Sequence, residues 1–168
     1  PSTLTFALGE AARITAPADL GFVATAGSSV WLIPSTQIAG VPWLGLNSQR
    51  EEIVTGTTGG VQFTLDAVEG PGRVAVFNAG ALGSGVGEHV FDGPGSSYTL
   101  GPNTHAHQNW VFTAPGTYTL TISMRVTPTG AALTGSGYGS SGEVTATGAL
   151  GTSSRPMASQ VVGRTASG

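Results

Sequence analysis

The stretch "APGTYTLTISMRV", residues 114–126, decides the fold, because apolar and polar side chains alternate along it after a Pro-Gly turn. Its apolar members are Tyr118, Leu120, Ile122, Met124 and Val126, and the residues between them are Thr, Ser and Arg. Successive side chains of a β-strand point to opposite faces. The stretch therefore predicts a half-buried strand with its apolar face on the core.

Similar short runs recur along the first three quarters of the chain. They read "TLTFAL", "ARITA", "SSVWLI", "GVQFTLDAVEG", "GRVAVFNAG", "EHVF" and "SSYTL", and Gly and Pro separate them. The only helical signal is one turn at residues 47–53. About eight to ten short strands with such punctuation predict an all-β fold, an antiparallel β-sandwich of the jelly-roll or immunoglobulin-like type.

The composition points to an uncharged but polar surface. Charged residues are 9% of the 168 residues and Gly contributes 27, whereas an ordinary globular protein has about 25% charged residues. Hydroxyls, amides and backbone must therefore cover the surface. This pattern is typical of an extracellular domain, or of a subunit that neighbours cover.

Charge and cysteine content exclude several classes of function. The net charge is −3 and every basic residue is Arg, so the basic field that nucleic acids and anionic membranes require is missing. No run of about 18 apolar residues predicts a membrane span. The chain has no Cys, which removes disulfides and thiol chemistry.

The chain divides by composition into a β-sandwich domain, residues 1–127, and a C-terminal arm rich in Gly, Ser and Thr, residues 128–168. We expect a partner to order this arm, so the predicted partners are further copies of the chain or a larger protein assembly. Within the arm, "EVTATGAL" and "MASQVV" are candidate strands for another sheet edge. The N-terminal residues lack a secretory signal, which fits either a processed secreted protein or loss of an initiator Met before Pro1.

Two histidines, His105 and His107, flank Ala106 just before the strand that carries Trp110. If the whole segment is one strand, both histidines lie on the face opposite Trp110. Two His on one face can bind Zn²⁺, Cu²⁺ or Mn²⁺ when a third ligand joins them. The candidates for that ligand are His89, Glu88 and Asp92. The alternative is that the two histidines are only the polar side of a strand.

Three tryptophans could form a platform for stacking sugars. Trp31 and Trp110 lie within apolar runs, which predicts core positions for both. Trp43 lies between Pro42 and Leu44 in a predicted loop. It is the candidate ligand-facing aromatic, for example for a cell-wall glycan, and the alternative is a plug over the end of the sandwich.

The sequence gives little support for a catalytic site, so we expect no enzyme activity. Glu51 and Glu52 are adjacent and would diverge in a strand, which suits acid–base pairing poorly. No Gly-x-Ser-x-Gly elbow occurs. The string "GYGSSG", residues 137–142, matches a dinucleotide fingerprint, but no predicted strand precedes it and no helix follows.

Residues 20–126 resemble the actinobacterial surface-anchored domain known as choice-of-anchor M. Three segments carry the resemblance: "SVWLIPSTQIAGVPWLGLNSQ", "VEGPGRVAVF" and "HAHQNWVFTAPGTYTLT". The family's motif positions fall on Trp31, Pro34, Gln37, Trp43, Leu44, Gly45, His105, His107, Trp110, Phe112, Gly116 and Tyr118. The resemblance implies a wall-exposed module, often encoded near metal-type transporters. In this chain the Gly/Ser arm stands where the family carries its anchor.

The leading hypothesis is a non-enzymatic structural or surface-display subunit, a virion decoration or minor tail protein of a phage that infects actinobacteria. It would lie on the virion surface, with the arm docking it. One alternative is a metal-binding module on the cell surface that uses His105, His107 and His89. The other is an adhesin that binds cell-wall glycan through Trp43.

Overall fold

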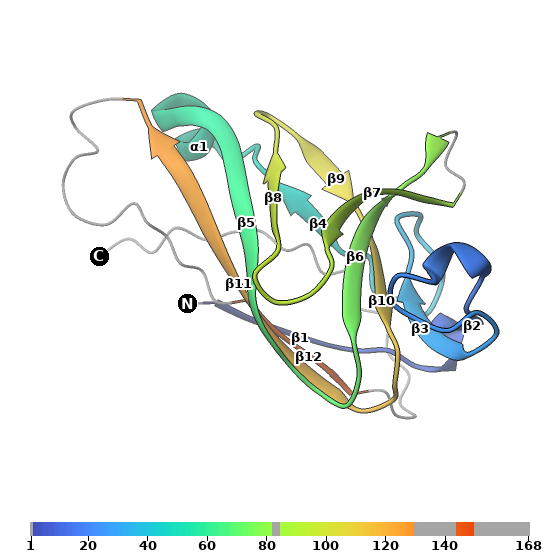
Figure 1. The fold of residues 1–168 in the computed structure, drawn as a ribbon. Coiled ribbons are helices and arrows are strands. Elements are labelled where there is room, and N and C mark those ends of the chain that lie inside the picture. The colour runs from blue at the N-terminus through green and yellow to red at the C-terminus, as the bar shows by residue number, and fades with distance from the viewer. Residues whose placement is uncertain (1, 82–84, 130–143, 150–168) are drawn as a thin grey trace.

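The computed structural model describes residues 2–81, 85–129 and 144–149, and the side chains of residues 7–81 and 85–129. The described residues form two five-stranded sheets and a two-stranded ribbon (Figure 1). The strand order is β1-β12-β11-β5-β8 in the first sheet and β2-β3-β10-β6-β7 in the second. Almost all pairs are antiparallel, which confirms the predicted all-β class.

The strands of the first sheet are β1 (Ser2–Ala7), β5 (Thr57–Glu69), β8 (Ser97–Leu100), β11 (Thr117–Pro128) and β12 (Val144–Ala149). Those of the second are β2 (Arg13–Thr15), β3 (Ser29–Ile33), β6 (Val74–Ala79), β7 (Val86–Phe91) and β10 (Asn109–Phe112). The ribbon consists of β4 (Gly45–Asn47) and β9 (His105–His107). The helical elements are η1 (Glu10–Ala12), η2 (Ala18–Leu20) and α1 (Glu51–Gly56), so a helix stands where one turn was expected.

The two large sheets share one hydrophobic core. From the first sheet, β11 buries Tyr118, Leu120 and Ile122, which are at most 3% exposed, while the residues between them stay at least partly exposed. From the second sheet, Trp110 and Phe112 of β10 join the same cluster. The alternation predicted for β11 is therefore confirmed, as is the core position of Trp110.

The outer face of the second sheet is covered as well. Val111 of β10 packs in a second cluster with Leu20 and Val23, which belong to the segment that follows β2. Arg73 fastens this segment, because its two Nη atoms donate to the carbonyls of Phe22 and Val23 at 2.9 and 3.1 Å. The strand β10 is consequently buried on both faces.

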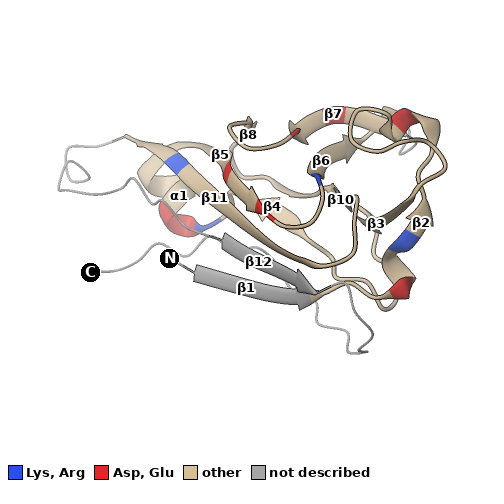
Figure 2. Ribbon diagram, turned by 60° about the horizontal axis from the view of Figure 1, so that its bottom comes forward, with Lys and Arg blue, Asp and Glu red and all other residues tan. Residues whose placement is uncertain are grey.

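Charged side chains are sparse and dispersed on the described part of the chain. Figure 2 shows acidic and basic residues scattered over several elements, with no large cluster of either sign. The outward residues of β11 include Thr119, Thr121 and Ser123, and Ser123 donates to Asp66 of the neighbouring β5 at 3.1 Å. Hydroxyls therefore cover much of this sheet face, as the composition predicts.

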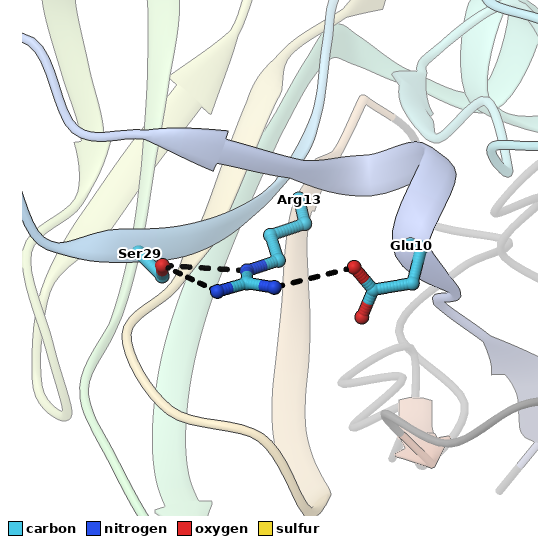
Figure 3. A network of polar contacts seen from close by, with 3 residues as sticks. All are labelled: Glu10, Arg13 and Ser29. Carbon is cyan, nitrogen blue, oxygen red and sulfur yellow. Dashed lines mark hydrogen bonds and ion pairs between the residues drawn. The ribbon is translucent and has the colours of Figure 1, made fainter.

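One small polar network joins η1 to the edge of the second sheet (Figure 3). Arg13 donates to Ser29 Oγ from Nε and Nη2 at 3.3 and 3.0 Å, and its Nη1 lies 3.4 Å from Glu10 Oε2. All three residues are exposed. An exposed ion pair contributes about 0–1 kcal/mol, so this network orients η1 and does not hold the fold.

The segment Val144–Ala149, predicted as a candidate strand of the arm, forms β12 in this chain's own sheet. It pairs parallel with β1 and antiparallel with β11. β11 ends at Pro128, one residue past the expected domain end. The other candidate strand, "MASQVV", and the string "GYGSSG" lie outside the described residues.

Candidate functional site in the ribbon of β4 and β9

The two-stranded ribbon brings together two segments that lie about sixty residues apart in the sequence. Gly45 pairs with His107, and Asn47 pairs with His105. At the end of the ribbon, Ser48 Oγ donates to the carbonyl of Gly101 at 2.7 Å and accepts from the backbone N–H of Thr104 at 2.9 Å. The segments around Trp43 and His105, which also carry the family resemblance, thus form one structural unit.

The histidines do not belong to the strand that carries Trp110, which corrects the single strand expected there. β9 ends at His107, and β10 begins at Asn109 in a different sheet. Between them Gln108 is fully buried. His105 is nevertheless exposed and His107 half-buried, so the ribbon still presents both imidazoles near the surface.

The ring of His107 is fixed by a backbone carbonyl and an aromatic face. Its Nδ1 lies 3.0 Å from the carbonyl oxygen of Leu44. A carbonyl only accepts hydrogen bonds, so Nδ1 carries the proton. In the neutral ring, Nε2 then holds a lone pair. Burial lowers the pKa of His107, and the nearby His105 lowers it further, although the bond to Leu44 works against the shift.

Trp43 packs on one face of the His107 ring. The two rings are stacked, with centroids 3.6 Å apart and an angle of 8° between the planes. The Nε1 of Trp43 donates to the carbonyl of Ser35 at 2.9 Å. Trp43 is half-buried, and the imidazole already occupies one face of its ring. These contacts agree better with a wall that fixes His107 than with an open sugar-stacking platform.

Gly45 is the residue that lets His107 approach the ribbon so closely. A Cβ at this position would lie 2.7 Å from the carbonyl oxygen of Ala106 and 2.9 Å from His107 Nδ1. Real Cβ atoms essentially never come so close to other atoms. Any other residue at Gly45 would have to move the histidine or the strand.

His105 lies beside His107, with 4.8 Å between the ring centroids and a tilt of 42°. No described residue forms a hydrogen bond with its ring. An imidazole nitrogen binds Zn²⁺ at about 2.0–2.1 Å, so two rings that share one ion have centroids within about 6.5 Å. The pair satisfies this limit, so the ring separation is compatible with one shared ion.

The structure places the predicted third ligands elsewhere. In the segment of β7, His89 Nδ1 lies 2.7 Å from Asp92 Oδ1, and the His89 ring packs on Phe22 at 4.3 Å. Glu88 accepts a hydrogen bond from Asn78 at 3.3 Å. Within residues 7–81 and 85–129, no group of three His, Asp or Glu side chains is arranged to hold a metal. A metal at His105 and His107 would keep positions open for other ligands.

Sequence reasoning missed Gln108. This side chain is fully buried, and neither its Oε1 nor its Nε2 has a hydrogen-bond partner in the described structure. The indole Nε1 of Trp110 shares this property. No pattern in the sequence distinguishes Gln108 from the polar residues around it, because the break between β9 and β10 is what turns it inward.

Glu51 and Glu52 lie in the first turn of α1 and not in a strand. Both are exposed, and Glu52 Oε2 lies 3.4 Å from Arg50 Nε. A backbone hydrogen bond, followed by Arg50, lowers the pKa of Glu52. Both effects favour the ionised carboxylate, which is the form expected of a surface ion pair.

Comparisons with protein-family models, with curated proteins and with solved structures found no match to this chain. The described helices include none that is long and apolar enough to cross a membrane.

Proposed function

We propose that this chain is a non-enzymatic surface-display module whose ribbon of β4 and β9 binds a divalent transition metal through His105 and His107. The observation that carries the proposal is the bond between His107 Nδ1 and the carbonyl of Leu44. A backbone partner on one ring nitrogen is the usual device that fixes the tautomer of a metal-binding histidine. It makes Nε2 the available ligand atom.

The chemistry of the pair favours Cu²⁺ and Zn²⁺ over Mn²⁺. Imidazole suits the first two ions, whereas Mn²⁺ prefers oxygen ligands, and intrinsic affinity rises along the series to Cu²⁺. The lowered pKa of His107 keeps its ring neutral at pH 7, which is the form that binds metal. With two ligands from this chain, water or a donor from another molecule completes the coordination.

Display on a surface is supported by the character of the exposed faces. They are rich in hydroxyls and poor in charge. The resemblance to the choice-of-anchor M domain supports the same placement, since its motif residues at 43–45 and 105–107 come together in the ribbon. The location that we propose is a virion of a phage of actinobacteria, as a decoration or minor tail protein, and the cell wall is the alternative.

Calorimetric titration of the full chain with Zn²⁺, Cu²⁺ and Mn²⁺ tests the metal site. We expect Cu²⁺ to bind most tightly and Mn²⁺ most weakly, and each of His105→Ala and His107→Ala to weaken Zn²⁺ binding at least tenfold. The matched control is His89→Ala, because His89 is also a partly exposed histidine but lies against Asp92. Equal Zn²⁺ affinity in the wild type and in His105→Ala would contradict the proposal.

A further inference from the structure

A cavity of about 400 Å³ lies between η2 and the outer face of the second sheet. Its apolar wall includes Ile14, Leu32 and Phe77, and its polar wall includes Asp19, Ser35 and Asn109. Sites for small molecules usually measure about 300–1,000 Å³ and combine an apolar lining with a few fixed polar groups. The cavity has the size and the lining of such a site.

The amide of Asn109 is fixed at this cavity. Asn109 is only 9% exposed, and its Oδ1 accepts from the backbone N–H of Ser35 at 2.9 Å. Its Nδ2 donates to the carbonyl of Phe77 at 3.4 Å. An amide group has two donor hydrogens and two acceptor lone pairs. One of each is used here, so Asn109 can still accept a hydrogen bond from a ligand and donate one to it.

Asp19 gives the cavity its charge. It is the one charged residue among the described residues of the lining, and no described residue forms an ion pair or hydrogen bond with its carboxylate. The carboxylate reaches across to the start of β7, because a Cβ at Gly85 would lie 3.1 Å from Asp19 Oδ2. The nearest Arg in sequence, Arg13, is engaged with Glu10 and Ser29. Arg73, which donates to the carbonyls of Phe22 and Val23, does not line the cavity, so the described lining carries one negative charge and no positive one.

We propose that this cavity binds a small organic cation, an amine or quaternary ammonium compound with an apolar body. The apolar body packs against Leu32 and Phe77, and the cationic group lies at Asp19. The aromatic face of Phe77 adds attraction for a cation that approaches it. This site is separate from the metal site at His105 and His107, although Ser35 contacts both Asn109 and Trp43.

The experiment is an NMR titration of the full chain, in EDTA, with three probes of matched size: benzylammonium, benzyl alcohol and benzoate. We expect benzylammonium to bind at least fivefold more tightly than benzyl alcohol, and benzoate to bind most weakly. The amide signals of residues that line the cavity, such as Ser35 and Val86, should shift. EDTA removes any metal, so the result does not depend on the proposed metal site.

Two variants test the roles of charge and of space. Asp19→Asn should remove the preference for benzylammonium over benzyl alcohol, and Ala79→Leu should weaken all three probes by filling the cavity. Asp66→Asn, on the first sheet, is the control and should bind as the wild type does. Asp19 is exposed, so its substitution should leave the thermal unfolding unchanged. Lack of benzylammonium binding at millimolar concentration, or equal affinity for the three probes, would overturn the proposal.

Discussion

The consecutive strands β10 and β11 differ in how the rest of the chain covers them. β10 lies between β3 and β6, and all four of its residues are buried. β11 buries every second residue, and the residues between face outward. The difference arises because the segment around Leu20 and Val23 packs on the outer face of the second sheet, whereas hydroxyl side chains cover the outer face around Thr121.

This difference in cover also separates the chemistry of the two sheets. A cavity lies between the second sheet and the segment that covers it. Asn109 of the buried strand β10 is part of its polar wall. The first sheet offers a layer of hydroxyls, such as the pair Thr64 and Ser97 at 2.9 Å. Fixed polar groups in an apolar wall are typical of ligand sites, so we expect the second sheet to carry the binding of small molecules.

The largest effect should come from Phe112→Ala, because this ring lies in the core that the two sheets share. Phe112 is 2% exposed and packs edge-on against Tyr118 at 5.1 Å between ring centroids. Removal of a buried Phe side chain lowers the free energy of unfolding by about 3–5 kcal/mol. Urea denaturation measures this loss. Thr119→Ala on the outward face of β11 is the control, with an expected change within about 0.5 kcal/mol.

A pair of opposite, nearly isosteric substitutions sharpens the comparison. Val111→Thr places a hydroxyl in the second core cluster, where it should cost about 1–3 kcal/mol unless it finds a partner. Thr121→Val removes a hydroxyl from the outward face of β11, and we expect a change within about 0.5 kcal/mol. Urea denaturation of both variants checks this. Equal losses would show that the two strands are covered alike, contrary to the structure.

The sequence predicts β11 well and β10 less well for the same reason. One-sided burial leaves an alternating pattern, and residues 117–126 show it in full. Burial on both faces erases the alternation, so no pattern of residue types marks β10: Asn109 is only 9% exposed, and its amide meets backbone partners at Ser35 and Phe77. A polar residue with two backbone partners is buried at little cost.

The candidate site was predictable in its residues but not in its geometry. The histidine pair and Trp43 were identified from residue type and spacing, yet their contact depends on the pairing of Gly45 with His107. No local periodicity encodes a pairing between segments so far apart in the chain, and three residues are too few to show an alternation. For the same reason, the prediction of His89 as a third ligand, which rested on closeness in sequence, does not match its position in the segment of β7 beside Asp92.

Gly45→Ala tests whether the ribbon's geometry makes the site. The added Cβ would collide with the carbonyl of Ala106 and with the ring of His107, so the two strands must separate. We expect a loss of about 1–2 kcal/mol, because overpacking usually costs about 1–3 kcal/mol and a short ribbon can shift. Zn²⁺ affinity should fall at least tenfold by calorimetry.

Gly60→Ala on β5 is the matched control for this substitution. A Cβ at Gly60 would lie 3.6 Å from its nearest neighbour, the carbonyl of Leu100, which is an ordinary contact. Gly60→Ala should therefore leave Zn²⁺ binding unchanged. If Gly45→Ala also bound Zn²⁺ as the wild type does, the position of the His107 ring would not determine the site.

The smallest effect concerns pH and the half-buried ring of His107. Burial is the main cause that lowers its pKa in the folded chain, so the unfolded chain, with a pKa of about 6.5, takes up the proton first as the pH falls. The unfolded state then binds more protons, and stability declines as the pH falls below about 6.5 until the folded chain is protonated as well.

The melting temperature of the wild type should therefore fall more steeply between pH 7 and pH 5 than that of His107→Gln. Water screens the charge of a partly exposed ring, which keeps the difference small, and parallel slopes for the two proteins would show that the ring is no more buried than His105.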